Sequence, residues 1–118
     1  MVVHVVLFRP KTSVSPDERK ALALAFETAV RTIPSVRRAQ VGRRVRHGAG
    51  YEAMPQPDLQ YAALLEFDDQ AGLQAYLQHP AHAEPGRRFF EVMEEGVVID
   101  YELRDGKAAG EIVTDWLD

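Results

Sequence analysis

The first expected strand of this 118-residue chain is apolar on both of its faces, so the fold has to cover both. Residues 2–9 are rich in β-branched side chains, which is typical of a buried strand. Successive side chains of a strand point to opposite faces. The two faces carry, respectively, Val2, Val6 and Phe8, and Val3, Val5 and Leu7. Helices packed on one side of a sheet cover only one of these faces, and the other needs a second covering layer.

A helix follows this strand, and its start is marked by a capping box. Ser15 is placed as the cap, Pro16 stands at the first helical position, and Glu18 comes three residues after the cap. Apolar side chains then recur at spacings of three and four, which is the pattern of one buried helix face. The helix is expected to stop before Pro34, because the residue before a proline disfavours helical backbone.

The order of the remaining elements predicts the fold class. We expect strands at 36–46, 59–67 and 97–103, a loop at 47–58, and helices from about Asp69 to Leu77 and from Ala83 to Glu94. Gly96 is expected to end the last helix. The order strand, helix, strand, strand, helices, strand predicts a ferredoxin-like α+β fold, a split βαβ with a four-stranded antiparallel sheet in the order 4-1-3-2.

The uncovered sheet face predicts a partner. Two copies packed sheet to sheet would bury both apolar faces in a dimeric α/β barrel, so we expect a symmetric homodimer. We assign residues 1–104 to the ferredoxin-like domain and 105–118 to a C-terminal tail. The tail holds Trp116, which suggests docking on the partner subunit. The alternative is that the tail covers the apolar face within one chain.

Charge and composition limit the kinds of molecule that this protein is expected to bind. The formal net charge is −4, which gives no general attraction to nucleic acid or to an anionic membrane. The chain has no cysteine, so disulfide and thiol chemistry are excluded. The apolar N-terminus lacks a basic leader and is too short to span a bilayer. We therefore expect a cytoplasmic protein that binds neither nucleic acid nor a membrane.

The second expected strand is unusually basic. Its arginines are Arg37, Arg38, Arg43, Arg44 and Arg46. On an edge strand such charges discourage aggregation. In a dimer, some of them are expected to pair with Asp100, Glu102 or the acidic tail across the interface.

Two imidazoles and a phenol lie within residues 76–82, Tyr-Leu-Gln-His-Pro-Ala-His. This segment is where we expect any chemistry of the protein to take place. Pro80 ends one helix, and His82 stands at the start of the next, where it can change protonation near neutral pH. His4 is expected to be partly buried among valines. A purely structural alternative remains: His79 and His82 satisfy backbone groups at the junction, and Tyr76 and His4 are bonded core residues.

Four segments together resemble the stress-responsive A/B barrel family over about residues 2 to 103. They are the opening Val-His-Val-Val-Leu-Phe-Arg, an Ile-Pro before the second strand, the Tyr-Leu-Gln-His-Pro-Ala-His break, and a closing Val-Val-Ile-Asp-Tyr strand. The resemblance implies a dimeric ferredoxin-like barrel. Within the family, the site is similar to that of the plant polyketide cyclases that form olivetolic acid. Those enzymes close a poly-β-keto chain by aldol condensation without a metal or an organic cofactor.

This resemblance implies roles for individual residues. It identifies His82 and Tyr76 as a catalytic pair and His4 as a further histidine of the pocket wall. Phe26 and Tyr61 stand where the cyclases have a tyrosine and a histidine, and Met93, like Pro85, replaces a large aromatic residue. Since the catalytic pair is present but the walls differ, a different substrate is expected.

We therefore expect a barrel that binds a small molecule. The expected chemistry is cofactor-independent acid–base catalysis on an apolar substrate that carries a carbonyl group. The residues expected to act are His82, Tyr76 and His4, and those expected to bind substrate are Phe26, Tyr61, Met93, Val98 and His79. Two alternatives stay open: a non-catalytic dimeric stress-response or binding module, which predicts a filled interior, and a cofactor-free monooxygenase. A metal site is possible in principle from His79, His82, Glu84 and His4, since a spacing of three is compatible with chelation. No cysteine adds to it and the proline constrains the junction, so no metal or cofactor is expected.

Overall fold

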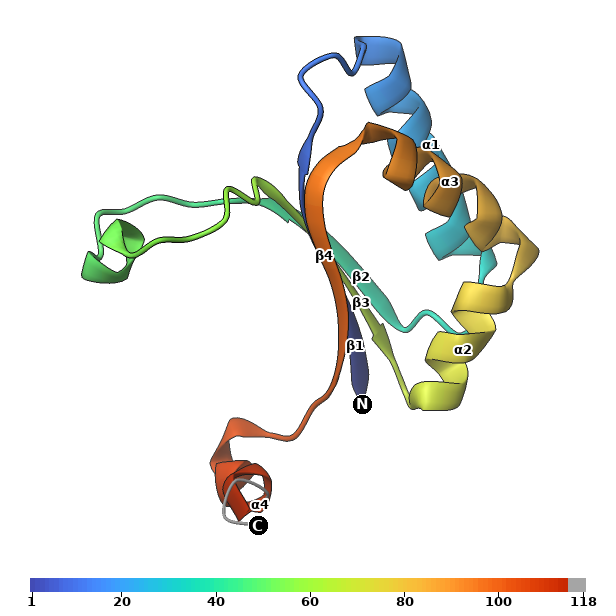
Figure 1. Cartoon of the computed structure of the whole chain (residues 1–118). Coiled ribbons are helices and arrows are strands. Elements are labelled where there is room, and N and C mark those ends of the chain that lie inside the picture. Colours follow the sequence, from blue (N-terminus) through green and yellow to red (C-terminus); the bar gives the residue numbers. More distant parts are fainter. Residues whose placement is uncertain (115–118) are drawn as a thin grey trace.

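A computed structural model describes residues 1–114, in which an antiparallel sheet carries helices on one face (Figure 1). The strands are β1 (Val2–Pro10), β2 (Arg38–Arg43), β3 (Tyr61–Phe67) and β4 (Met93–Glu102). The helices are α1 (Pro16–Thr32), α2 (Gln70–Gln78), α3 (Ala83–Val92) and α4 (Ala109–Val113), with 3-10 turns η1 (Gly50–Ala53), η2 (Pro80–His82) and η3 (Gly106–Ala108). The strand order is β2-β3-β1-β4. It confirms the ferredoxin-like α+β fold and the predicted order 4-1-3-2.

Helix α1 begins and ends where the sequence places it. The Ser15 hydroxyl accepts a hydrogen bond from the Glu18 N–H at 3.1 Å, and Pro16 occupies the first turn. The last helical residue is Thr32, and the N–H of the following Ile33 still donates to the Ala29 carbonyl. The capping box and the proline stop are both confirmed.

The end of α3 differs from the expectation. The helix stops at Val92, and β4 already begins at Met93, so the prediction that Gly96 ends the helix is wrong. Gly96 instead lies in the ladder opposite Phe8. A Cβ there would lie only 3.0 Å from the Leu7 carbonyl oxygen and 3.2 Å from the Cβ of Phe8. Glycine is needed at this point because two strands approach closely, and not because a helix ends.

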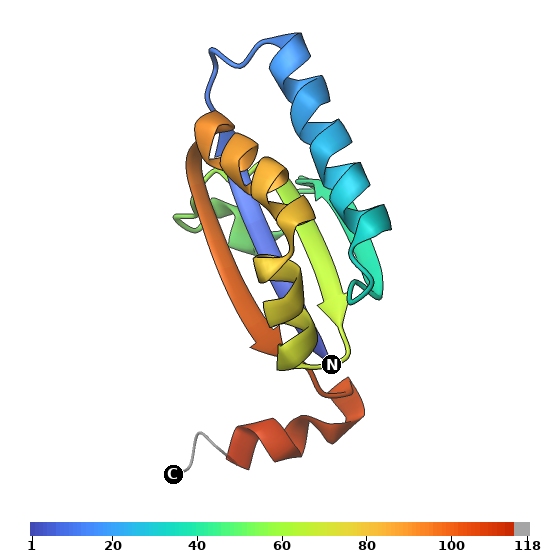
Figure 2. The ribbon, with the colours of Figure 1, turned by 90° about the vertical axis from the view of Figure 1, so that its right-hand side faces the viewer.

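The core fills one end of the space between the sheet and its helices. Phe67 and Leu65 are its largest fully buried side chains, and both lie on β3. The cluster also contains Val2, Ala29, Ile33, Leu73 and Tyr76. These residues come from the start of β1, the end of α1 and the whole of α2. Helices α1 and α3 continue over the other end of the sheet (Figure 2), where the core residues give way to a cleft.

The opposite face of the sheet is apolar and uncovered in the described chain. Leu64, Val97, Ile99 and Tyr101 are all exposed on it, from β3 and β4. Two segments project on this side, away from the helices: residues 44–60, between β2 and β3, and α4 (Figure 1). We call these segments the two arms. The tail as described does not lie over the face, and Trp116, on which its expected docking depends, lies outside the described residues.

Four of the five arginines expected in the basic strand, all but Arg43, pair with carboxylates of the described chain. Arg37 pairs with Asp68 at 2.9 Å, and Arg44 and Arg46 each lie 3.7 Å from Asp58. Strand β2 is an edge strand, as expected. Asp100, one of the partners expected across a dimer interface, bonds to His4 within the chain.

Candidate active site

His4 is held in the middle of β1 by a carboxylate on the neighbouring strand. The register pairs His4 with Asp100 on β4, so both side chains lie on the helix side of the sheet. The Nδ1 of His4 lies 2.6 Å from the Asp100 Oδ1, and His4 is only 6% exposed. Because a carboxylate only accepts hydrogen bonds, Nδ1 carries the proton and Nε2 stays available to a ligand.

Tyr76 lies in the last turn of α2 and links His4 to His82. Its ring centroid lies 5.9 Å from that of His4 and 4.7 Å from that of His82, and it packs on Phe67 at 5.3 Å. Tyr76 is 4% exposed, yet its hydroxyl has no hydrogen-bond partner among residues 1–114. Burial raises the pKa of Tyr76 to about 12, so the hydroxyl stays protonated and can donate.

His82 is brought to Tyr76 by the turn that Pro80 forces. The proline ends α2, and the Nδ1 of His79 accepts a hydrogen bond from the Ala81 N–H at 3.0 Å, which fixes the short η2 turn. Gly86 lies one turn further on, and a Cβ there would lie 3.3 Å from the Cε1 of His82. Glycine therefore leaves room for the imidazole. No hydrogen bond to the His82 ring occurs in the described part of the chain.

The protonation of His82 suits a general base. Its pKa is lowered from the ordinary value of 6.5, first by burial and second by the charge of His4. The imidazole is therefore neutral at pH 7 and can take a proton. Burial and a neighbouring histidine are the physical causes, so both can be tested separately.

We expect the NMR titration of the His82 ring to have its midpoint below pH 6.5 in the folded protein. In a His4→Gln variant the midpoint should rise, because the second cause is removed, but it should stay below 6.5, because the ring remains buried. The folded state binds this proton more weakly than the unfolded chain, so this group costs stability as the pH falls below about 6.5. A midpoint at or above 6.5 in the wild-type protein would contradict the assignment.

His4, Tyr76 and His82 all open onto one cleft between the sheet and helices α1 and α3. The cleft has a volume of about 700 Å³. Its walls are mainly apolar and include Val6, Phe8, Leu22, Phe26, Val30, Pro85, Phe89 and Val98. An apolar cavity with a few convergent polar groups is the usual form of a small-molecule site.

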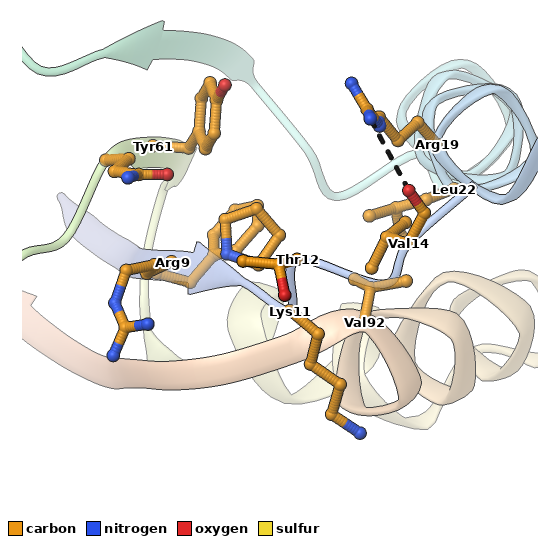
Figure 3. Close-up of a pocket in the computed structure, with 11 residues that line it drawn as sticks. Arg9, Lys11, Thr12, Val14, Arg19, Leu22, Tyr61 and Val92 are labelled. Atoms are coloured by element: carbon orange, nitrogen blue, oxygen red, sulfur yellow. Dashed lines mark hydrogen bonds between the residues drawn. The ribbon is translucent and has the colours of Figure 1, made fainter. Parts of the chain in front are cut away.

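The residues expected to bind substrate do not all line the cleft. Phe26 and Val98 line the cleft. Tyr61 does not; it lines a second hollow at the end of β1 (Figure 3). Met93 and His79 line neither, since Met93 stands at the start of β4 and His79 is the cap of the η2 turn. The three residues expected to act are thus brought together, while the five expected to bind substrate are not.

Asp100 is the site residue that the sequence did not identify. Its one signal is a carboxylate directly after the apolar run from Val97 to Ile99, and its partner lies 96 positions away. Among the groups considered for a metal, Glu84 is engaged by Arg87 and Arg88 at 2.8 and 2.6 Å, and His79 by the Ala81 N–H. Within residues 1–114, no three His, Asp or Glu side chains gather in a way that could hold a metal ion. Nor is any described helix long and apolar enough to cross a bilayer.

Solved structures share this fold. A Dabb family protein with a ferredoxin-like fold from Mesorhizobium loti is 25% identical, with 87% of this chain and 96% of that chain covered and a TM-score of 0.68. A dimeric ferredoxin-like protein of unknown function from Bacteroides fragilis is 26% identical, with 86% and 95% covered and a TM-score of 0.61. A hydroxynitrile lyase from Passiflora edulis is 20% identical, with 88% and 94% covered and a TM-score of 0.72.

No functionally curated protein matches the sequence. The family model of the stress responsive A/B barrel domain, by contrast, matches residues 2–103, which is nearly the whole chain. The protein belongs to the stress responsive A/B barrel family.

Proposed function

We propose that this protein is a homodimeric small-molecule-binding barrel that performs acid–base chemistry on an apolar substrate bearing a carbonyl group. The observation that carries the proposal is the convergence of His4, Tyr76 and His82 on one apolar cleft. The Tyr76 hydroxyl and the His82 ring have no hydrogen-bond partner in residues 1–114. Both side chains line the cleft, where a polar ligand atom can form a hydrogen bond with each of them.

The chemistry follows from the two protonation states. Neutral His82 takes a proton from the carbon next to the carbonyl: the C–H bond breaks, an N–H bond forms, and the electron pair moves toward the carbonyl oxygen. The Tyr76 hydroxyl donates a hydrogen bond to that oxygen as its negative charge develops. Asp100 bonds to Nδ1 of His4 and fixes the orientation of this ring in the cleft wall. The imidazolium of His82 then returns the proton to the product.

The uncovered sheet face is the reason for proposing a dimer. Exposed apolar side chains of β3 and β4 lie there on either side of β1, whose side chains on this face are also apolar, and such patches mark protein interfaces. The two arms project beyond this face and flank the space that a second copy would occupy (Figure 1). The B. fragilis protein of the same fold is dimeric.

Two alternatives share this scaffold. A non-catalytic module predicts a filled interior, and the cleft of about 700 Å³ does not fit that expectation. The P. edulis neighbour is a lyase, so the fold carries an enzyme in at least one protein. A cofactor-free monooxygenase would use the same cleft, and product analysis distinguishes it from proton transfer alone.

Ligand binding can be tested with a bulky side chain placed in the cleft. We expect 2-octanone to displace the fluorescent probe N-phenyl-1-naphthylamine from the wild-type protein. Ala23 lines the cleft from α1, so Ala23→Trp should weaken binding of both compounds about tenfold by filling it. Leu24 is the neighbouring residue, is 62% exposed and lies outside the cleft, so Leu24→Trp is the matched control. Equal binding by the two variants, or no binding to the wild type, would refute the site.

A further inference from the structure

A smaller hollow at the end of β1 adjoins the cleft. Its volume is about 360 Å³, and it is formed by the end of β1, the loop that follows, the first turns of α1 and the start of β3 (Figure 3). Phe8, Arg19 and Leu22 line both spaces. The two spaces therefore meet at these three side chains, and we call the smaller hollow the mouth.

The mouth is positively charged in a protein whose net charge is −4. Arg9, Lys11 and Arg19 line it, and no carboxylate does so in the described chain. Arg9 is partly neutralised by Glu95 at 3.2 Å. Arg19 and Lys11 form no ion pair among residues 1–114. Unpaired cations at the opening of an apolar cleft attract and orient an anion.

The position of Arg19 is fixed by the loop. Its Nη2 lies 3.5 Å from the carbonyl oxygen of buried Val14 (dashed in Figure 3), which holds the guanidinium beside the opening. Arg9 and Tyr61 come from the strand side of the mouth, whereas the side chain of Lys11 runs outward (Figure 3). Thr12, Gln60 and Tyr61 add neutral hydrogen-bond donors to the same hollow. Arg19 is thus the cation best placed to meet a bound anion.

The length of the cleft sets the size of the ligand. His4 and Phe8 share one face of β1 four residues apart, which corresponds to about 13 Å along a strand. A molecule whose carbonyl lies at His4, Tyr76 and His82 therefore needs an extended apolar body to bring its other end to the mouth.

We propose that the mouth binds a terminal oxyanion of the substrate, a carboxylate or a phosphate, so that the substrate class is an extended apolar chain with a carbonyl at one end and an anionic group at the other. This inference rests on the proposed function, because it takes the cleft as the binding site. It adds the charge and the orientation of the substrate.

The test compares ligands with the same chain and different ends. Decanoate, decyl phosphate and decanol are each used to displace N-phenyl-1-naphthylamine from the wild-type protein and from an Arg19→Gln variant. We expect decanoate or decyl phosphate to bind more tightly than decanol, and Arg19→Gln to weaken that anion about fivefold and decanol hardly at all. Lys20→Gln is the matched control, because this exposed neighbour on α1 lines neither space. The anion that shows the larger loss identifies the end group.

Salt gives a second readout that does not depend on a variant. Raising the ionic strength screens exposed charges, so it should weaken the anion and leave decanol unchanged. If decanol binds as well as both anions, or if Lys20→Gln acts like Arg19→Gln, the mouth proposal is wrong while the ligand-binding cleft stands. If none of the three compounds binds, the cleft itself is wrong and the mouth proposal falls with it.

Discussion

Replacing His82 with glutamine is expected to slow proton exchange at the α-carbon of a bound ketone by about two to four orders of magnitude. Glutamine retains hydrogen-bonding groups near Tyr76 but cannot take a proton near pH 7. The reaction is followed by ¹H NMR as the α-protons of 2-octanone are replaced by deuterium in D₂O. This readout reports C–H cleavage directly and needs no knowledge of the natural product.

The pH profile distinguishes a base from a structural histidine. Because the pKa of His82 is lowered from 6.5, the exchange rate should rise with pH to a plateau, with the midpoint of the rise below pH 6.5. Tyr76→Phe should lower the plateau by about two orders of magnitude, because the enolate oxygen loses its donor. The profile's midpoint should agree with the NMR titration of the same ring.

His47 offers the control for this experiment. It lies in the arm between β2 and β3, where its Nε2 is 2.8 Å from the Tyr51 hydroxyl, and it does not line the cleft. His47→Gln should exchange 2-octanone at the wild-type rate. If His82→Gln loses less than a few-fold, or if both variants lose equally, His82 is not the base.

The second large effect concerns the proposed dimer. The substitution Ile99→Asp is expected to convert this dimer to a monomer at micromolar concentration. Ile99 lies on the uncovered face of β4 and is 39% exposed in the single chain. In a sheet-to-sheet dimer its partner would bury it, and an unpaired carboxylate buried there costs several kcal/mol. The symmetry of the dimer introduces the charge twice, so we expect the dissociation constant to rise by about three orders of magnitude or more.

Sedimentation velocity measures the change, and circular dichroism checks that the variant is folded. Leu24→Asp is the matched control, since it places the same charge at an apolar, 62% exposed position on the helix side of the molecule. It should sediment like the wild-type protein. The proposed dimeric barrel would be contradicted by a wild-type chain that is monomeric at micromolar concentration. An Ile99→Asp variant that stays dimeric would contradict it as well.

The parts of the fold that sequence reasoning predicted are those set by local patterns. The capping box at Ser15, the stop before Pro34 and the alternation of Val2 to Phe8 act within a few residues of one another, and each appears as expected. The error at Gly96 has the opposite origin. Its role depends on the close approach of Phe8 and Leu7 from a strand far away in the chain, and no local pattern records that contact.

The candidate site also has features that the sequence predicted and features that depend on contacts between distant residues. The sequence by itself determined the proline break between Tyr76 and His82, but no local geometry forces residues six apart across a proline together, and the family resemblance was what implied one cavity for them and for His4. Only the tertiary structure decided how closely the three rings approach, that Asp100 orients His4, and that Tyr61 lies at the mouth instead of in the cleft. The physical reason is strand register: which residues of β1, β3 and β4 stand opposite one another is set by packing over the whole sheet, and it joins residues 96 positions apart.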